Sequence, residues 1–216
     1  MSVKEYSGRS RERVDPRVRR TRELIMRSFN ELVAEKGHAG LTVSEIAGRA
    51  TINRATFYAH FADQYELFDQ VVREAFREEL RRKLPAPSVF GEENLEALIR
   101  AACDYLAGLN TACSRTDRQF RPLIEARVQG ELYELLLGWI QASPVDSPST
   151  NPEITASVVS WAIFGTGLRW SRGEQSGTVE TFVDQALSAI IGSLEPDMFS
   201  APYRSGHAKG ARPGNQ

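Results

Sequence analysis

Apolar residues recur at the spacing of an α-helix along almost the whole of this 216-residue chain. The pattern i, i+3, i+4, i+7 places apolar side chains on one face of a helix. One set that follows it is Leu95, Leu98, Ile99, Ala102, Leu106 and Leu109. No segment alternates apolar and polar residues with the period of two that a half-buried strand requires. The sequence therefore predicts an all-α fold of about nine helices.

Proline breaks divide this pattern into two parts. Pro85 and Pro87 interrupt the helical spacing, because proline lacks the amide hydrogen and clashes with the preceding turn. We predict one domain over residues 17–84 and a larger helical domain over 85–199. The ends, 1–16 and 200–216, are polar with no apolar periodicity, so we expect a disordered arm and a disordered tail.

Charge is distributed unevenly between these parts. Residues 1–60 hold 12 Lys and Arg against 7 Asp and Glu, whereas residues 61–216 hold 15 against 21. A basic head on an acidic body is typical of a phosphate-binding module joined to a body that does not bind nucleic acid. Chance also produces such a split, so the charge supports a DNA-binding function only together with a motif.

Three helix-start signals fall close together after residue 41. Thr42 and Glu45 have the spacing of a capping box, Asn53 is a favourable N-cap, and Asp63 with Glu66 repeats the pattern. Only Thr51, Ile52 and Asn53 separate the first two short helices. This arrangement predicts a helix-turn-helix, whose second helix enters the major groove of DNA.

The second short helix has the side chains that a recognition helix needs. Phe57 and Phe61 lie four residues apart and form an apolar face, and no acidic residue occurs from Asn53 to Ala62. Small and polar side chains allow close approach to base edges and phosphates. The other faces of this helix carry such side chains: Arg54, Ala55, Thr56, Tyr58, Ala59 and His60.

From Arg20 to about Leu80 the chain resembles the TetR family of repressors. The resemblance is carried by Thr42 and by the string TFYAHF at residues 56–61. It implies a three-helix DNA-binding head, a connecting fourth helix, and a variable helical body that dimerises and usually binds a small molecule. Two positions depart from the family. Thr51 stands where a glycine is frequent, which predicts a less open turn or a strained φ, and Gln64 replaces a lysine that contacts phosphate.

The resemblance also implies roles for individual residues. Thr42, Tyr58 and His60 would contact phosphates, while Arg54, Ala55 and Thr56 would read base edges. Four arginines would lie near the DNA backbone or an adjacent minor groove: Arg17, Arg19, Arg20 and Arg22. The alternatives are that Tyr58 and His60 only pack on the next helix, and that the arginines form a solvated face.

The segment from Ile154 to Leu168 is apolar almost all round. Such a helix must be covered on all sides, so we expect part of it to lie in a subunit interface. In the TetR resemblance, the last two helices form the dimer core. The candidate interface residues are Trp161, Phe164, Gly165, Leu168, Phe182, Ala186 and Ile190. A C2 homodimer would present two recognition helices to a palindromic operator.

Several body residues are candidates for a ligand pocket. Aromatic and apolar side chains line most small-molecule sites, and an arginine suits a polar group of an amphipathic effector. The candidates are Tyr105, Phe120, Leu123, Arg127, Trp139 and Trp170. The alternative is that they are ordinary core residues.

Other function classes lack support in the sequence. We find no phosphate-binding loop, nucleophile elbow or metalloprotease motif, and the three histidines are far apart. We therefore expect no enzyme activity, no catalytic residues, no cofactor and no metal. Cys103 and Cys113 are expected to be buried small residues rather than oxidant sensors.

No segment has the length and hydropathy of a signal peptide or membrane span, so we expect a soluble, cytoplasmic protein with no membrane partner. The sequence predicts a repressor that a small apolar or amphipathic effector releases from double-stranded operator DNA. The alternative is a DNA-binding protein of the same fold without a small-molecule effector, acting architecturally or controlled by a protein partner.

Overall fold

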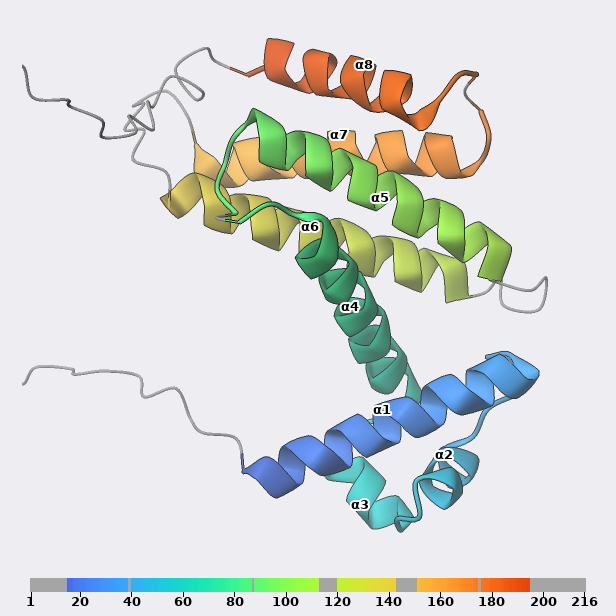
Figure 1. The fold of residues 1–216 in the computed structure, drawn as a ribbon. Helices are drawn as coiled ribbons and strands as arrows, with labels where there is room; N and C mark the ends of the chain where they lie inside the picture. Colours follow the sequence, from blue (N-terminus) through green and yellow to red (C-terminus); the bar gives the residue numbers. More distant parts are fainter. Residues whose placement is uncertain are drawn as a thin grey trace, which may run out of the picture. The chain divides into compact units, whose positions relative to one another are not determined.

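The structure is a computed structural model that describes residues 15–38, 40–86, 88–112, 120–142, 151–174 and 176–194 (Figure 1). The described residues form eight α-helices and no strand, which confirms the all-α prediction. The helices are α1 Pro16–Lys36, α2 Val43–Arg49, α3 Arg54–Tyr58, α4 Gln64–Lys83, α5 Glu92–Ala112, α6 Arg121–Ala142, α7 Pro152–Ser171 and α8 Val179–Gly192.

The number of helices differs slightly from the expected number of about nine. Eight helices occur among the described residues, and between residues 85 and 152 these are the two long helices α5 and α6. Residues 1–14 of the predicted arm, the whole predicted tail and the segment around Cys113 lie outside the described residues.

Local sequence signals explain where several helices begin and end. The carboxylate of Asp15 accepts a hydrogen bond of 2.8 Å from the amide of Arg17, and Pro16 occupies the first helical turn of α1. Asn151 caps α7 in the same way, and Thr178 caps α8. Gly37 ends α1 with φ of 77°, because glycine has no Cβ that would clash there.

The chain forms two compact units. Unit 1 comprises Met1–Arg77 and Thr111–Val128, and unit 2 comprises Glu78–Asn110 and Gln129–Gln216. These divisions fall at other points than the boundary expected near Pro85, because α4 and α6 each contribute residues to both units. The start of α6 therefore belongs to the same unit as the predicted DNA-binding head.

The core of unit 1 holds the first four helices together. Ile25 and Phe29 of α1, Ile46 of α2 and Phe57 of α3 are almost completely buried. Burying such a side chain stabilises a fold by about 1.5–3 kcal/mol. Each short helix thus contributes at least one fully buried side chain, and α2 and α3 lie along one side of α1 in Figure 1.

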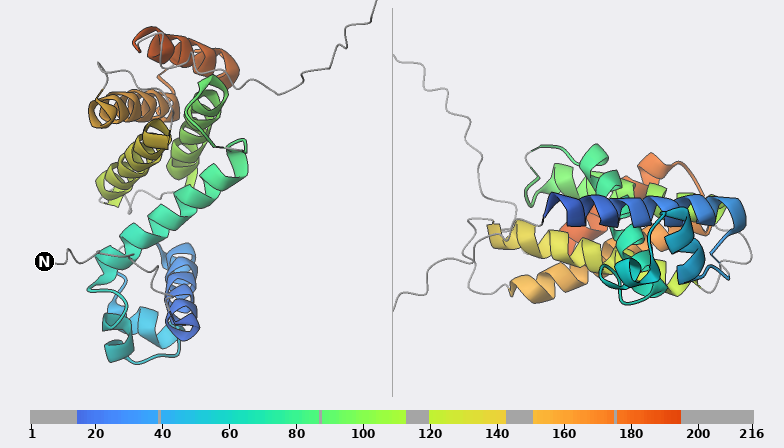
Figure 2. Two further views of the ribbon diagram at one scale, coloured as in Figure 1. Left: turned by 90° about the vertical axis from the view of Figure 1, so that its left-hand side faces the viewer. Right: turned by 90° about the horizontal axis from the view of Figure 1, so that it is seen from below.

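In unit 2, α5, α7, α8 and the later part of α6 pack as a helical bundle (Figure 2). Leu98 and Ala102 of α5, Leu132 of α6 and Ile163 of α7 are fully buried. Gly167 of α7 lies directly against α5, because a Cβ added there would be 3.2 Å from the backbone carbon of Ala102. The absence of a side chain at this position allows the two helices to approach closely.

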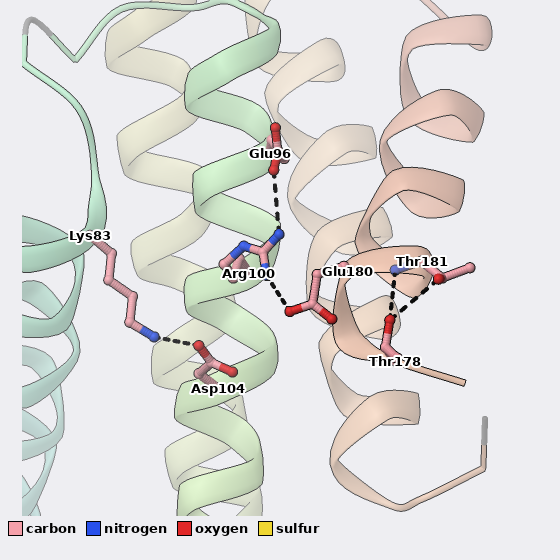
Figure 3. A network of polar contacts seen from close by, with 7 residues as sticks. All are labelled: Lys83, Glu96, Arg100, Asp104, Thr178, Glu180 and Thr181. Atoms are coloured by element: carbon pink, nitrogen blue, oxygen red, sulfur yellow. Dashed lines mark hydrogen bonds and ion pairs between the residues drawn. The ribbon is translucent and has the colours of Figure 1, made fainter. Parts of the chain in front are cut away.

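A network of ion pairs lies on the surface of unit 2 (Figure 3). Lys83 contacts Asp104 of α5, and Arg100 of α5 contacts Glu96 and, at 3.4 Å, Glu180 of α8. Partial burial opposes the charged form of Lys83, but its interactions with Asp104 and Glu79 together outweigh this and the pKa of Lys83 is raised. Pairs as exposed as those of Arg100 each contribute about 0–1 kcal/mol.

Cys103 is fully buried on α5, which confirms the expectation for this cysteine. Burial raises the pKa of its thiol to about 12, so almost no reactive thiolate forms at neutral pH. No helix in the described part of the chain has the length and apolar character needed to cross a bilayer.

The contact at Gly167 predicts an asymmetry between two glycines. Gly167→Ala places a methyl group 3.0 Å from the Leu106 side chain and should destabilise the protein by about 1–3 kcal/mol. Gly138→Ala, on α6 with nothing within 4 Å, should instead gain up to about 1 kcal/mol in helix propensity. Denaturant unfolding measures both, and equal effects would contradict the close approach of α5 and α7.

Candidate nucleic-acid interface

The predicted capping box at the start of α2 is present. The Thr42 hydroxyl accepts a hydrogen bond of 3.3 Å from the amide of Glu45, and the Thr42 amide donates one of 2.9 Å to the Glu45 carboxylate. Lys36, at the end of α1, also donates to this carboxylate. The bond from Lys36, followed by those from Thr42, lowers the pKa of Glu45 to about 2. Glu45 thus connects α1 to the start of α2.

A second set of ion pairs fixes the other end of α2. The Arg49 guanidinium donates two hydrogen bonds, of 2.7 and 2.6 Å, to the Glu35 carboxylate and lies 3.6 Å from Glu31. The hydrogen bond from Arg49 lowers the pKa of Glu35. Both carboxylates belong to α1, so α2 is attached to that helix at each end. No local pattern in the sequence indicates these pairs.

The turn after α2 is a Schellman motif with a threonine in place of glycine. The amide of Ile52 donates to the Ala47 carbonyl at 3.0 Å, and the amide of Thr51 donates to the Gly48 carbonyl at 3.1 Å. This motif requires a left-handed residue at the position of Thr51, and its φ is +55°. No other non-glycine residue in the described ranges has a positive φ. The strained φ expected at Thr51 is therefore confirmed.

The recognition helix α3 is fixed from its N-terminal end by Asn53. The Asn53 side-chain oxygen accepts hydrogen bonds of 2.7 Å from the amide of Thr56 and 3.0 Å from its hydroxyl. Phe57 and Phe61 are buried, as predicted, and their rings lie 5.8 Å apart. Because α3 has only five residues, these contacts determine which of its side chains face outward.

The predicted DNA contacts fall into two groups. Seven are exposed, and three, Thr56, His60 and Arg22, are half-buried. The Thr56 hydroxyl already donates to Asn53, and the Thr42 hydroxyl donates to Glu45 at 2.8 Å. The exposed residues are Thr42, Arg54, Ala55, Tyr58, Arg17, Arg19 and Arg20.

The arginines among the predicted DNA contacts differ in whether they form an ion pair within the protein. Arg19 lies 3.5 Å from Glu23 in an exposed pair. Arg20 and Arg54 make no ion pair with the described residues. These two guanidinium groups are therefore available to phosphates or base edges.

Arg22 has a different environment from the neighbouring arginines. Its Nη1 donates a hydrogen bond of 2.9 Å to the backbone oxygen of His60, and its Cζ lies 4.3 Å from the centroid of the Phe61 ring. The residues are 38 positions apart, so no periodicity in the sequence indicates this contact.

The six candidate ligand residues do not gather in one unit. Phe120, Leu123 and Arg127 belong to unit 1, whereas Tyr105, Trp139 and Trp170 belong to unit 2. The expectation treated α6 as a single body helix, and the division of α6 between the units separates them. Of the unit 2 residues, Tyr105 and Trp170 are half-buried and Trp139 is buried.

Within unit 1, Phe120 joins an aromatic cluster. Its ring lies 5.3 Å from His38, 5.2 Å from Phe68 and 6.4 Å from Tyr65. These distances suit edge-on and tilted ring packing. Phe120 therefore contributes to the core beside α1 and α4.

Arg127 is also bound within unit 1. Its Nε donates a hydrogen bond of 2.5 Å to the Asp69 carboxylate of α4, and its Nη2 donates to the second oxygen. A fork of this kind is geometrically specific and strong. The pair fixes the start of α6 to α4.

An exposed apolar stripe runs along α7 and includes one candidate interface residue, Trp161. Ile154, Val158 and Trp161 are 63%, 54% and 58% exposed and are spaced i, i+4, i+7. Gly165 and Leu168 continue this spacing and are half-buried. Phe164 is buried, with its ring 5.7 Å from that of Trp161.

On α8, Ile190 is buried within unit 2, while Phe182 and Ala186 are half-buried. The Phe182 ring stacks on that of Trp170 at 5.3 Å. A candidate interface residue and a candidate pocket residue therefore contact each other. The sequence pattern assigns Phe182 to the dimer interface and Trp170 to the ligand pocket, and does not indicate that these two residues contact each other.

Two short capped helices, a tight turn and an outward-facing second helix define a helix-turn-helix DNA-binding protein. Comparison with known proteins agrees. Residues 25–71 match the family model described as bacterial regulatory proteins, tetR family. The HTH-type transcriptional repressor KstR2 of Rhodococcus jostii is 26% identical over 176 residues, which cover 76% of this chain and 85% of that protein.

Other similarities cover the head alone or the fold alone. An uncharacterized HTH-type regulator of Bacillus subtilis, YxbF, is 41% identical over 66 residues, which are 30% of this chain and only 17% of that protein. A solved TetR-family regulator from Streptomyces coelicolor has a TM-score of 0.51 at 17% identity and covers 86% of this chain and 98% of its own. The multidrug binding protein EbrR, complexed with imidazole, has a TM-score of 0.52 at 19% identity, with 93% and 100% covered.

Residues 25–71 therefore form a DNA-binding segment of the kind described by the tetR family model, and the fold of the described residues is that of TetR-family regulators. The resemblance seen in the sequence is confirmed.

The strained turn predicts the effect of one substitution. Thr51→Gly removes the steric clash that a left-handed φ imposes on a side chain, which costs about 1–2 kcal/mol. Part of this gain in stability is lost, because glycine has a larger backbone entropy in the unfolded chain. We expect a net stabilisation of about 0.5–1 kcal/mol in denaturant unfolding. Thr51→Ala keeps the Cβ and should gain little, so equal gains from both variants would contradict strain at this φ.

Proposed function

We propose that this regulator binds a palindromic operator in double-stranded DNA as a homodimer and represses transcription from it. The observation that carries the proposal is the orientation of α3. Phe57 is fully buried, whereas Arg54, Ala55 and Tyr58 are exposed. A helix held in this way can insert its polar side into the major groove without unfolding.

Arg54 is the best candidate for direct base reading. It lies in the first turn of α3, is exposed, and makes no ion pair with the described residues. A guanidinium donates two parallel hydrogen bonds to O6 and N7 of guanine, the most common specific contact in protein–DNA complexes. The small Ala55 beside it lets the helix approach closely. We therefore expect a guanine in each half-site.

The phosphate contacts come from groups around α3. Tyr58 is 48% exposed, and its hydroxyl can donate to a phosphate oxygen. Arg20 of α1 has its charge uncompensated within the described residues. His60 and Thr42 remain proposed contacts, although the Thr42 hydroxyl would have to leave Glu45 to donate to phosphate.

The exposed stripe on α7 supports the homodimer. Three large apolar side chains at helical spacing, each more than half exposed in one chain, are expensive to leave in water. In a two-fold interface the same stripe meets its own copy. Two α3 helices would then face DNA at half-sites about 34–36 Å apart, one turn of the duplex, or a multiple of it.

The proposed effector is a small apolar or amphipathic molecule that binds the body and releases the DNA. KstR2 is named as a repressor and EbrR as a multidrug binding protein, which favours a sensor. The dispersal of the six candidate pocket residues over two units favours the alternative, a regulator without a small effector. A compound that raises the melting temperature and also lowers operator affinity would support the sensor over the alternative.

Selection of bound fragments from random duplex DNA tests the proposal. We expect the full chain to enrich a palindrome with a guanine in each half-site. Arg54→Ala should weaken binding to that operator by about 1–3 kcal/mol per half-site and relax the preference at the guanine position. The control Arg81→Ala removes an exposed positive charge from α4 and should leave the base preference unchanged. Recovery of no preferred sequence would refute the proposed function.

The dimer is tested at the centre of the stripe. Trp161→Asp should shift the protein from dimer to monomer in sedimentation velocity and weaken operator binding, because it places a charge in an apolar interface. Leu123→Asp is the matched control, since it changes an exposed apolar residue on α6 instead of α7. A dimer of unchanged stability in the Trp161 variant would remove this stripe from the interface.

A further inference from the structure

The side chain of Arg22 makes two contacts with the end of the recognition helix. Its Nη1 donates to the backbone oxygen of His60 at 2.9 Å, and the centre of the guanidinium lies 4.3 Å from the Phe61 ring centroid. Arg22 is half-buried on α1, and Phe61 is 1% exposed. A single planar cation thus bridges α1 and the residues that directly follow α3.

Apart from Arg22, the end of α3 is held by the buried rings of Phe57 and Phe61 and by the hydrogen bonds from the amides of Ala59 and Phe61 to the carbonyls of Ala55 and Phe57. A helix of five residues is too short to be stable by itself, and its last carbonyl groups have no partner within the helix. Its C-cap, Ala59, has ordinary right-handed angles, so no glycine turn closes the helix. Asn53 fixes the N-terminal end, and the contacts of Arg22 fix the C-terminal end.

This environment distinguishes Arg22 from the other arginines of α1. Arg19 and Arg20 are exposed, whereas the face of the Arg22 guanidinium is covered by an aromatic ring and one of its hydrogens is directed to a backbone carbonyl. A cation stacked on a ring and bonded to a carbonyl is attracted to both groups. At least one of its donors is therefore directed into the protein.

We propose that Arg22 is a positioning residue that sets the orientation of α3 on α1, and that it does not itself contact DNA. The inference rests on the proposed DNA-binding function. A small rotation of α3 would misplace Arg54 and Tyr58 relative to base edges, while phosphate attraction, which depends mainly on charge, would persist. Loss of the Arg22 contacts should therefore reduce binding to the operator more than binding to unrelated DNA.

Two variants separate positioning from phosphate contact. Arg22→Lys keeps the charge but lacks the planar group that stacks and donates in a fixed direction. We expect it to lose about tenfold in operator affinity and to bind unrelated DNA about as well as the wild type. A phosphate contact would instead tolerate lysine.

The dependence on salt gives the second criterion. In Arg22→Gln the slope of log affinity against log salt concentration should stay at its wild-type value, because no phosphate contact is lost. The matched control Arg20→Gln, on the same helix, should make that slope less steep by about 0.9 for each DNA-binding head, because one phosphate contact is lost. A drop of the same size in Arg22→Gln, with the preference for operator intact, would show that Arg22 contacts phosphate and would overturn the proposal.

Amide hydrogen exchange on the free protein tests, without DNA, whether the contacts of Arg22 hold the end of α3. The amides of Ala59 and Phe61 donate to the carbonyls of Ala55 and Phe57, and both should exchange faster in Arg22→Lys. The amide of Ala50 at the end of α2 should be unaffected, which controls for general unfolding. Unchanged exchange together with wild-type operator affinity would refute the positioning role. If the wild type prefers no DNA sequence, the proposed function fails, yet the exchange result still decides whether Arg22 fixes α3.

Discussion

The burial of Phe57 and Phe61 is the constraint on which the proposed DNA-binding surface depends. These two rings are buried in the core of unit 1 and fix the rotation of a helix that has only five residues. With that face inward, Arg54, Ala55 and Tyr58 are exposed by necessity. Two apolar side chains thus determine the chemistry that the opposite side of the helix presents, and the caps and ion pairs around them restrict its remaining freedom.

Features encoded within a few residues of one another were predictable from the sequence. The capping box of Thr42 and Glu45, the cap at Asn53, the stop at Gly37 and the strained Thr51 each depend on a local rule. Such local rules are sufficient to predict the helix-turn-helix and the faces of its helices.

Features that depend on two distant segments were not predictable in this way. Arg22 meets His60, Arg49 meets Glu35, and Arg127 meets Asp69 across 38, 14 and 58 positions. Any exposed arginine could satisfy the same local pattern, so the spacing does not indicate the partner. For the same reason the candidate pocket combined residues from both units, because α6 was treated as belonging to one domain.

The membership of residues 111–128 in unit 1 has a consequence for transplanting this head onto another regulator. A fragment that stops near residue 84 would lack Phe120 and Arg127, which leaves the rings of His38 and Phe68 uncovered and the Asp69 carboxylate without its fork. A functional chimera therefore has to exchange two separate stretches of sequence together. The exchangeable module in this protein is defined by contacts and is discontinuous along the chain.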